Sequence, residues 1–531
     1  MMTEEMAALK KEIEQRRTFA IISHPDAGKT TLTEKLLLFG GAIREAGSIK
    51  GRKASRHATS DWMEIERKRG ISVTSTVLQF KYEGYHVNLL DTPGHQDFSD
   101  DTYRTLVAAD SAVMLIDAAK GVEPQTIKLF EVCRMRGIPI FTFINKLDRE
   151  SRDPFELLKE LEDVLGIRSY PMNWPVGSGA HFRGIFDRHH TDFEQYDGRD
   201  HQVERTPLSG VGDDSLRERI GEEQHQKLIE EITLLDVAGD AFDVSAIKEG
   251  QLTPVFFGSA ISNFGVETFL RQFLELAPTP VARPTNEGPL LPESPTFAGF
   301  VFKIQANMNP AHRDRVAFVR VCAGRFLRGM NVAHPRTGKR INLSAPQQFF
   351  AQDRSIVEEA YPGDIIGIFD PGIFRIGDTL MESGSLVFEG LPQFSPEHFA
   401  RVTLMDTGKY KQYNKGLAQL TEEGTVQLFR VANRTEDLIL GVVGVLQFEV
   451  LEYRLKAEYG VTVSLTRLPY QLARWIVSDR TDELLFDRSS CLLVKDQDER
   501  LVMLFPNEFA TRWVVERNEG LTLHSTSNAL V

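Results

Sequence analysis

The sequence predicts a multidomain protein: an α/β domain built on a parallel sheet with helices on both faces, then a β-barrel domain, then a split-βαβ (α+β) domain. Three observations support this fold class. The chain has 531 residues, more than the roughly 250–300 at which a single hydrophobic core stops growing. Near-continuous apolar runs alternate with helix-like stretches in the first half, which is typical of parallel sheets. Proline clusters then set off two further regions in which the strands are spaced differently.

The α/β domain is predicted over residues 1–280. Five apolar runs have the length and composition of buried parallel strands: 19–22, 87–90, 112–116, 139–144 and 255–257. Between them the sequence turns polar and strongly acidic, and the apolar pattern returns only at Val255. We therefore expect an insertion at about 187–250 within this domain.

The β-barrel domain is predicted over residues 297–390 and the α+β domain over residues 397–531. Prolines between 278 and 295 indicate a linker, after which short β-prone runs are separated by turn residues. A second proline-containing break, at 392–396, precedes the order strand, helix, strand, strand, helix, strand, which predicts the split-βαβ arrangement. These elements are expected at 401–404, 411–421, 426–431, 438–442, 445–458 and 461–465.

The composition excludes several classes of protein. With 41% apolar and 26% charged residues, the chain is too hydrophobic for wholesale disorder. Cys133, Cys322 and Cys491 lie far apart without a Cys-x-x-Cys pair, so neither a disulfide framework nor a cysteine zinc site is expected. Residues 1–17 lack the apolar core of a signal peptide, and no run approaches the roughly 20 apolar residues that span a bilayer. We expect a cytoplasmic protein with no membrane partner.

The charge is unevenly distributed along the chain. The net charge of −13 would by itself argue against a nucleic-acid partner. However, residues 187–250 contain 17 acidic and 7 basic side chains, so the insertion alone carries −10 of that charge. Because phosphate neutralisation depends on local charge, the nearly neutral remainder of the chain can present basic patches to RNA.

The strand that ends at Ile22 runs into a candidate phosphate-binding loop and then a helix-like stretch, 31–39. The loop residues are Ser23, His24, Pro25, Asp26, Ala27, Gly28, Lys29 and Thr30. In such loops backbone N–H groups face the phosphates, the lysine reaches the β- and γ-phosphates, and the hydroxyl binds Mg²⁺. Gly28, Lys29 and Thr30 fit these roles. Ser23 stands where the strict pattern has glycine, so the alternative is a helix that merely starts with a lysine.

Three further motifs follow in order, each at the end of a predicted strand. They are Asp91, Thr92, Pro93 and Gly94; Asn145, Lys146, Leu147 and Asp148; and Ser259 with Ala260. Asp91 can reach Mg²⁺ through water, and the Gly94 N–H can contact a γ-phosphate. Taken alone, each motif is also an ordinary turn or helix cap.

The second of these motifs selects the base. The Asp148 carboxylate can accept both the N1–H and the exocyclic amine of guanine, while the Lys146 stem covers the ring. Adenine has no donor at N1 and would leave a buried carboxylate partly unpaired. Ser259 and Ala260 can offer a backbone N–H to the guanine oxygen. Because open α/β sheets bind ligands at this edge, the four motifs together predict a site for GTP and GDP.

On these residues the sequence resembles the translational GTPases. In that family the histidine after Asp-Thr-Pro-Gly, here His95, is the hydrolytic residue, and an Arg-Gly-Ile-Thr string forms the first switch. The matching string here is 69–72, with Ser72 in place of threonine. The resemblance implies a P-loop GTPase domain in which Ser72 joins Thr30 and, through water, Asp91 at a Mg²⁺ ion.

Within the family, the chain is most similar to the factors of translation termination, over about residues 16–475. Besides the phosphate-binding loop, the similar strings are 60–64, 302–308, 312–318 and 444–448. The resemblance implies a ribosome-dependent GTPase that removes the stop-codon-reading class-I release factors after peptide release. The implied partners are ribosomal RNA, ribosomal proteins and those release factors, without DNA. The short region after the barrel disfavours the translocation factors, which carry additional domains.

Two questions stay open in the sequence. A guanine-nucleotide-sensing module that need not hydrolyse GTP is a rival of another class, although the presence of His95 favours an enzyme. Basic side chains in the two later domains indicate either RNA contacts or simply solvated faces. They are Lys303, Arg313, Arg315, Arg320, Arg325 and Arg328 in the barrel region and Lys409, Lys411 and Lys415 in the last domain.

Overall fold

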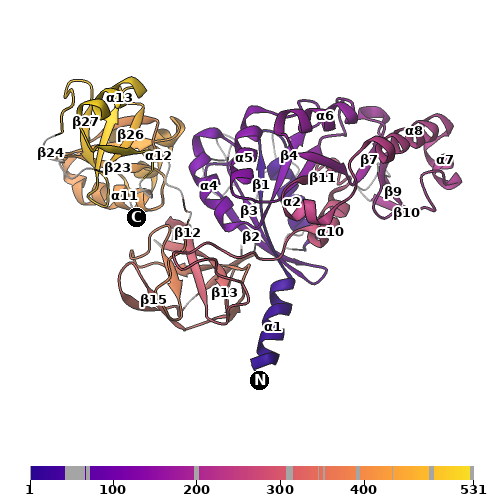
Figure 1. Cartoon of the computed structure of the whole chain (residues 1–531), viewed down its shortest axis with the longest axis horizontal. Coiled ribbons are helices and arrows are strands. Elements are labelled where there is room, and N and C mark those ends of the chain that lie inside the picture. Colours follow the sequence, from indigo (N-terminus) through magenta and orange to yellow (C-terminus); the bar gives the residue numbers. More distant parts are fainter. Residues whose placement is uncertain are drawn as a thin grey trace.

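A computed structural model of the protein shows three units, with the barrel contacting both of the others (Figure 1). The structure describes residues 2–41, 66, 72–196, 203–306, 315–344, 346–350, 353–389, 391, 395–432, 434–477 and 484–526. Four stretches that the sequence analysis used lie outside these ranges: 60–64, 69–71, 307–308 and 312–314, the last of which contains Arg313. The order of α/β unit, barrel and α+β unit is the predicted fold class.

The first unit is built on a mostly parallel sheet. Its strands among the described residues follow the spatial order β2-β3-β1-β4-β5-β11-β6, with only the edge strand β2 antiparallel to its neighbour. They are β1 (Arg16–Ser23), β2 (Thr76–Tyr82), β3 (Tyr85–Asp91), β4 (Ser111–Asp117), β5 (Ile140–Asn145), β6 (Arg168–Pro171) and β11 (Leu252–Phe257). Along β1, Phe19 and Ile21 belong to one apolar cluster, and Ala20 and Ile22 to another. Because successive side chains of a strand point to opposite faces, both faces of this sheet are covered.

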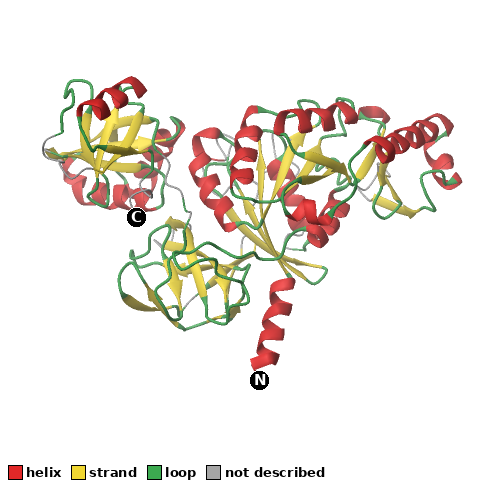
Figure 2. Ribbon diagram, viewed as in Figure 1, coloured by secondary structure: helices red, strands yellow, loops and turns green. Residues whose placement is uncertain are grey.

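Helices provide that cover on the two faces (Figure 2). In the main α/β unit these helices are α2 (Lys29–Phe39), α4 (Ser99–Ala108), α5 (Pro124–Met135), α6 (Pro154–Leu165) and α10 (Val266–Leu276), with the 3₁₀ turns η1 (Gln96–Phe98) and η2 (Gly179–His181). Helix α1 (Met2–Glu14) is mostly exposed and projects from the body rather than covering the sheet (Figure 1). Helix α6 shows how the sequence sets its limits. Asp153 caps its start by accepting the N–H of Phe155 at 2.9 Å, Pro154 opens its first turn, and Gly166 ends it with φ of 66°.

The insertion forms its own antiparallel sheet, in the order β10-β9-β8-β7 among the described strands. Its elements are β7 (Asn173–Val176), β8 (Gly184–Asp187), β9 (Asp192–Tyr196), β10 (Val203–Pro207), α7 (Asp214–Ile220), α8 (Glu222–Ala238) and α9 (Val244–Lys248). Figure 1 places it at the end of the molecule farthest from the other two units. The sheet starts at Asn173, earlier than the acidic stretch that indicated it, because β7 and β8 are apolar and buried.

The barrel unit has one long curved sheet and a short second one. The described strands of the long sheet follow the order β16-β15-β21-β12-β13-β20-β17-β18, and β14 pairs with β19. Their bounds are β12 (Ala298–Ala306), β13 (Arg315–Ala323), β14 (Phe326–Leu327), β15 (Asn331–His334), β16 (Lys339–Asn342), β17 (Gln347–Phe350), β18 (Asp353–Ile356), β19 (Glu359–Ala360), β20 (Ile365–Phe369) and β21 (Thr379–Met381). Alternate residues of β12 and β13, such as Val301 and Val319, fill its interior.

The last unit contains the predicted split-βαβ order. Its elements are β22 (His398–Leu404), η3 (Thr407–Lys409), α11 (Tyr410–Glu422), β23 (Gln427–Val431), β24 (Arg434–Val442), α12 (Leu446–Tyr459), β25 (Val463–Leu468), β26 (Leu472–Val477), β27 (Leu492–Lys495), β28 (Leu501–Phe505), α13 (Glu508–Arg517) and β29 (Thr522–His524). Strand β27 pairs with β23, so the chain after residue 468 extends the same sheet rather than trailing as a tail.

Three of the basic residues considered for RNA contact are covered by other parts of the chain. Lys303 and Arg315 are 5% and 6% exposed, and Arg320 is 1% exposed. Arg320 pairs with Asp110 of the first unit at 2.5 Å, and Arg315 pairs with Asp370 at 2.6 Å and also with Glu422 of the last unit. The hypothesis of RNA contact is therefore wrong for these three. Within the described ranges, no helix is both long and apolar enough to cross a membrane.

Candidate guanine-nucleotide site

The predicted phosphate-binding loop connects β1 to α2. Helix α2 begins at Lys29, and Gly28 precedes it with φ of 102°, a conformation that favours glycine. A Cβ atom on Gly28 would lie 2.3 Å from Asn145 Nδ2. The loop therefore packs directly against the end of β5, which leaves no room for a side chain at this position.

Lys29 and Asp91 meet at the centre of the site. Lys29 Nζ lies 2.5 Å from Asp91 Oδ1, and both side chains are buried. Asp91 is the last residue of β3, the strand that pairs with β1 in parallel. The cation predicted to reach the phosphates and the carboxylate predicted to reach Mg²⁺ are thus neighbours.

Asn145 joins the motifs of three different loops. Its Nδ2 donates to the Ala27 carbonyl at 2.8 Å, and its Oδ1 accepts the Ala260 N–H at 2.9 Å. One amide therefore fixes the phosphate-binding loop and the loop after β11 relative to the end of β5. This uses the donor and the acceptor of a single side chain, which a carboxylate could not do.

The groups predicted to recognise the base are held in the same way. The Ser259 hydroxyl donates to Asp148 Oδ1 at 2.6 Å. Lys146 Nζ donates to the Asp26 carbonyl at 2.5 Å and lies 2.7 Å from Asp117 Oδ2, which extends its stem across the loop. Lys146 itself has φ of 74°, a strained conformation that is characteristic of binding sites.

Asp117 is a site residue that the sequence patterns did not single out. It ends β4, between the strands that carry Asp91 and Asn145. Burial alone would raise the pKa of its carboxyl group, but hydrogen bonds from Lys146 and the Ala119 N–H outweigh that effect and lower the pKa. Its position at the carboxyl end of a parallel strand was the available signal.

His95 lies just beyond this centre, at the start of the turn η1. Its side chain is 31% exposed, and its Nδ1 accepts the N–H of Asp97 at 3.2 Å. The imidazole is therefore held at Nδ1, and within the described ranges no hydrogen bond is seen at Nε2.

The oxygen groups predicted to hold the metal suit a hard cation. Asp91 and the hydroxyls of Thr30 and Ser72 belong to the chemistry that Mg²⁺ prefers. Asp91 is 2% exposed, and Thr30 is half-buried in the first turn of α2. Within the described part of the chain, the buried Ser23 Oγ and His24 Nδ1, both in the loop, have no hydrogen-bond partner. Buried polar atoms without a partner are rare in folded proteins, so the loop is suited to a polar ligand.

The structure thus brings the four predicted motifs to one edge of the sheet. Ser72 is described, but the residues before it in the first-switch string are not. Besides Asp117, the patterns missed Glu123, whose Oε1 lies 3.4 Å from His24 Nε2.

Comparisons with known proteins agree with this arrangement. Residues 14–279 match the Elongation factor Tu GTP binding domain, residues 296–383 match Elongation factor G domain 2, and residues 388–515 match the Class II release factor RF3, C-terminal domain. Proteins named Peptide chain release factor 3 are similar over nearly the whole chain. That of Symbiobacterium thermophilum is 61% identical, covering 99% of this chain and 100% of its own, and one from Listeria monocytogenes is 55% identical, covering 97% and 99%.

A solved structure from Thermus thermophilus has the same fold. It superposes with a TM-score of 0.70 at 24% identity, covering 91% of this chain and 73% of its own.

The parallel sheet, its four-motif edge and the barrel that follows define a translational GTPase. The order of the three units and the sequence identity to relatives over nearly the whole chain place the protein in a narrower family within this class. The chain belongs to the peptide chain release factor 3 family, whose GTPases act in translation termination.

Proposed function

We propose that this GTPase works on the ribosome after the finished peptide has been released. There it uses GTP binding and hydrolysis to drive the stop-codon-reading class-I release factors off the ribosome, so that they can act again. The observation that carries this proposal is the last unit, which matches the C-terminal domain of class II release factors over residues 388–515. This unit separates the chain from factors that share only the GTPase and barrel domains.

We assign the nucleotide to the loop 23–30 together with 91–95, 145–148 and 259–260, within a GTP-binding domain of residues 1–280. The assignment rests on the contacts between these segments, above all the two hydrogen bonds of Asn145. Asp148, which the Ser259 hydroxyl fixes, faces the base edge in this proposal. The barrel (297–390) and the α+β domain (397–531) would transmit the nucleotide state to the ribosome.

Thr30, Ser72 and, through water, Asp91 would hold Mg²⁺, which supplies positive charge to offset the charge that develops on the transferred phosphoryl group. Lys29 would contribute the same kind of stabilisation with its ammonium group. It exchanges its 2.5 Å contact with Asp91 for the phosphate oxygens when the substrate is present. Asp91 ends β3, and Lys29 and Thr30 open α2, so the backbone that carries these three side chains is already in place.

His95 would orient the attacking water. Phosphoryl transfer depends mainly on positioning and electrostatics, so a side chain that aligns water accelerates the reaction without forming a covalent bond. Because His95 is partly exposed and lies outside the Lys29–Asp91 centre, we expect slow hydrolysis by the free protein and fast hydrolysis when the ribosome moves the imidazole inward.

The experiment is a multiple-turnover release assay. Post-termination ribosomes are mixed with a limiting amount of a class-I release factor, and the rate of peptide release is followed beyond one equivalent of that factor. The proposal predicts that this chain with GTP raises the steady-state rate and leaves the first round unchanged. An unchanged steady-state rate would show that the protein does not recycle class-I release factors and would favour a nucleotide-sensing module instead.

A further inference from the structure

The turn that follows His95 contacts the last domain of the chain. Within η1, Asp97 Oδ2 accepts the backbone N–H of Leu446 at 2.7 Å. Leu446 opens α12, a helix of 14 residues whose own N-cap residue, Val445, provides no side-chain hydrogen bond. The first N–H groups of a helix lack partners within the helix and favour a negatively charged acceptor. Asp97 supplies that acceptor from another domain.

The same carboxylate lies beside His95. Asp97 Oδ1 is 3.3 Å from His95 Nδ1, and that nitrogen accepts the Asp97 N–H at 3.2 Å. One residue therefore contacts the imidazole with its backbone and helix α12 with its side chain. A shift of α12 relative to η1 must move Asp97, and with it the hydrogen-bond partner of His95.

The approach of the two domains at this point is unusually close. A Cβ atom on Gly444 would lie 2.3 Å from the Cα of Asp97, which real side chains do not tolerate. Gln447 fixes the Gly444 turn, because its Oε1 accepts the N–H groups of Val443 at 2.9 Å and of Gly444 at 3.0 Å. The last domain thus presents a fixed, side-chain-free surface to Asp97.

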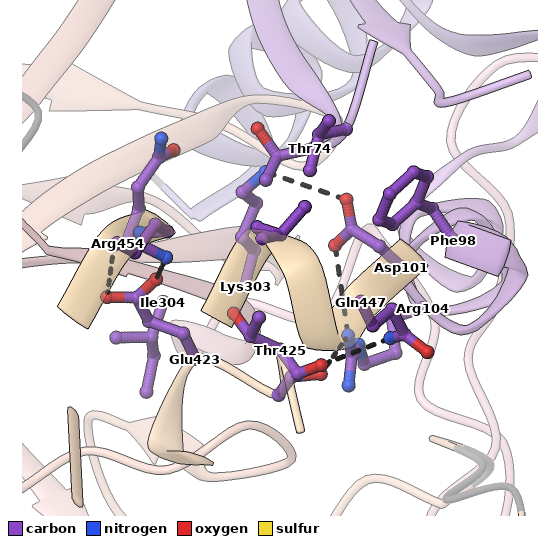
Figure 3. Close-up of a pocket in the computed structure, with 14 residues that line it drawn as sticks. Thr74, Phe98, Asp101, Arg104, Lys303, Ile304, Glu423, Thr425, Gln447 and Arg454 are labelled. Atoms are coloured by element: carbon purple, nitrogen blue, oxygen red, sulfur yellow. Dashed lines mark hydrogen bonds and ion pairs between the residues drawn. The ribbon is translucent and has the colours of Figure 1, made fainter. Parts of the chain in front are cut away.

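Apolar packing reinforces the contact on the other side of η1. Phe98 is 4% exposed and packs with Val73 and with Val450 of α12. Figure 3 shows Phe98 beside Asp101 at the junction of the three domains, in a pocket that Thr74, Lys303 and Gln447 also line. The segment 95–98 is therefore held by a hydrogen bond at Asp97 and by a buried ring at Phe98.

We infer that Asp97 is a positioning residue for GTP hydrolysis: by capping α12 it makes the seating of the last domain against the GTPase domain determine where His95 lies. This inference rests on the proposed role of His95 and adds its regulation. Movement of the last domain on the ribosome would be transmitted to the imidazole through a single carboxylate. A displacement of about 1 Å at a reacting group costs on the order of a hundredfold in rate, so a small change in the seating of α12 is sufficient.

The test compares variants of the full-length protein on both sides of the contact. Asp97→Ala removes the cap, Gly444→Ala pushes α12 away, and Asp97→Asn keeps an oxygen that can accept the Leu446 N–H. Asn507→Ala is the matched control, because Asn507 caps α13 of the same domain through the Ala510 N–H at 3.0 Å, far from η1. GDP affinity and ribosome-stimulated kcat are measured for each variant, with His95→Ala in parallel.

The inference predicts that Asp97→Ala and Gly444→Ala lower ribosome-stimulated kcat by about tenfold or more, with GDP affinity changed less than about twofold. Asp97→Asn and Asn507→Ala should stay close to wild type. Wild-type kcat in Asp97→Ala would overturn the inference, and so would an Asp97→Asn variant as slow as Asp97→Ala. If Gly444→Ala fails to fold, Asp97→Ala, which adds no atoms, decides the question.

His95→Ala distinguishes a failure of the proposed role of His95 from a failure of the proposed role of Asp97. If it retains wild-type turnover, the proposed role of His95 is wrong. If it is inactive while Asp97→Ala and Gly444→Ala turn over normally, only the positioning role of Asp97 is overturned.

Discussion

Single side chains hold the candidate nucleotide site together, and Asn145 is the clearest case. Its amide bridges the Ala27 carbonyl and the Ala260 N–H across loops that are more than a hundred residues apart in sequence. The sequence motif indicates the residue type, because this position needs one donor and one acceptor on the same group. It does not indicate that Gly28 must lie against the same amide, which follows only from the packing.

Gly28→Ala should abolish tight nucleotide binding. The new methyl group would lie 2.3 Å from Asn145 Nδ2 at a backbone φ of 102°, so it both displaces the bridging amide and strains the loop. We expect affinity for GDP to fall by at least about a hundredfold, equivalent to about 2.8 kcal/mol. Titration with a fluorescent GDP analogue measures the loss. Gly84→Ala, which also has positive φ but no heavy atom within 4 Å of its Cβ position, is the control and should bind GDP normally.

Asp148→Asn should change the preferred base. The amide can no longer accept two hydrogen bonds from guanine, but it can donate to the additional oxygen of xanthine. We expect guanine-nucleotide affinity to fall by about 10- to 100-fold, corresponding to a lost hydrogen bond to a charged group, and xanthine-nucleotide affinity to rise. Competition between GDP and xanthosine diphosphate measures both. Unchanged preference for guanine would mean that Asp148 does not contact the base.

At the scale of elements, buried charges join α4, β12 and α11 at the centre of the molecule. Lys303 on β12 donates to the backbone carbonyl of Ser75 and, at 3.0 Å, to its hydroxyl, and it lies 3.8 Å from Asp101 on α4. Glu423, just after α11, accepts the Ala306 N–H at 3.0 Å. Figure 3 shows these side chains converging from the three domains. The segment that carries Ser72 is thus attached to the barrel three residues further on.

Lys303→Met tests this attachment. It leaves the partly buried carboxylate of Asp101 without one of its two cations and removes the hydrogen bonds to Ser75, so we expect a loss of about 2–3 kcal/mol in the free energy of unfolding. Denaturant melts of the full-length protein measure the loss. Lys339→Met, at an exposed position of the same barrel, should change the free energy by less than about 0.5 kcal/mol. An equally small effect at Lys303 would show that the junction adds no stability.

Asp101 gives the junction a predicted pH dependence. Burial would raise the pKa of Asp101, but Lys303 and then Arg104 outweigh burial, so the pKa lies below the usual 3.8. A carboxyl group whose pKa is lowered on folding stabilises the protein above its unfolded pKa, and this stabilisation is lost as the pH falls through the folded pKa. Asp101→Asn should therefore flatten the fall in stability between about pH 5 and pH 3, whereas the exposed Asp163→Asn should not. If the free energy of unfolding fell in parallel with pH for Asp101→Asn and wild type, the predicted contribution of Asp101 would be wrong.

The sequence predicted the strands with continuous apolar runs and missed those without them. Strand β2 escaped notice because Gln79 and Lys81 interrupt its apolar pattern at the sheet edge. The start of the insertion was placed too late because β7 reads like another buried strand. Lys303 and Arg320 looked like a solvated strand face, since no local pattern reveals that a neighbouring domain covers them. The contact of Asp97 with Leu446 joins residues 349 positions apart, and nothing near either residue indicates it.

At the scale of the whole molecule, the GTPase and barrel units are attached firmly and the acidic insertion stands apart. Arg16 pairs with Asp364 at 2.7 Å, and Arg320 pairs with Asp110 at 2.5 Å, both across the interface and both buried. A buried ion pair tolerates little displacement, because a separated partner would remain charged and desolvated. We therefore expect these two units to move as one body. The last unit meets η1 through the Asp97–Leu446 hydrogen bond and the packing of Phe98, and this seating is the step between nucleotide and ribosome that we propose to be adjustable.

The most direct test of the proposed function is to measure the residence time of a fluorescently labelled class-I release factor on post-termination ribosomes. The account predicts that this protein with GTP shortens the residence time by about tenfold or more, a change of at least about 1.4 kcal/mol in the barrier to dissociation. Asp148→Asn should be inactive with GTP and regain activity with xanthosine triphosphate, which ties the effect to the assigned site. A residence time that is the same with and without the protein and GTP would contradict the account.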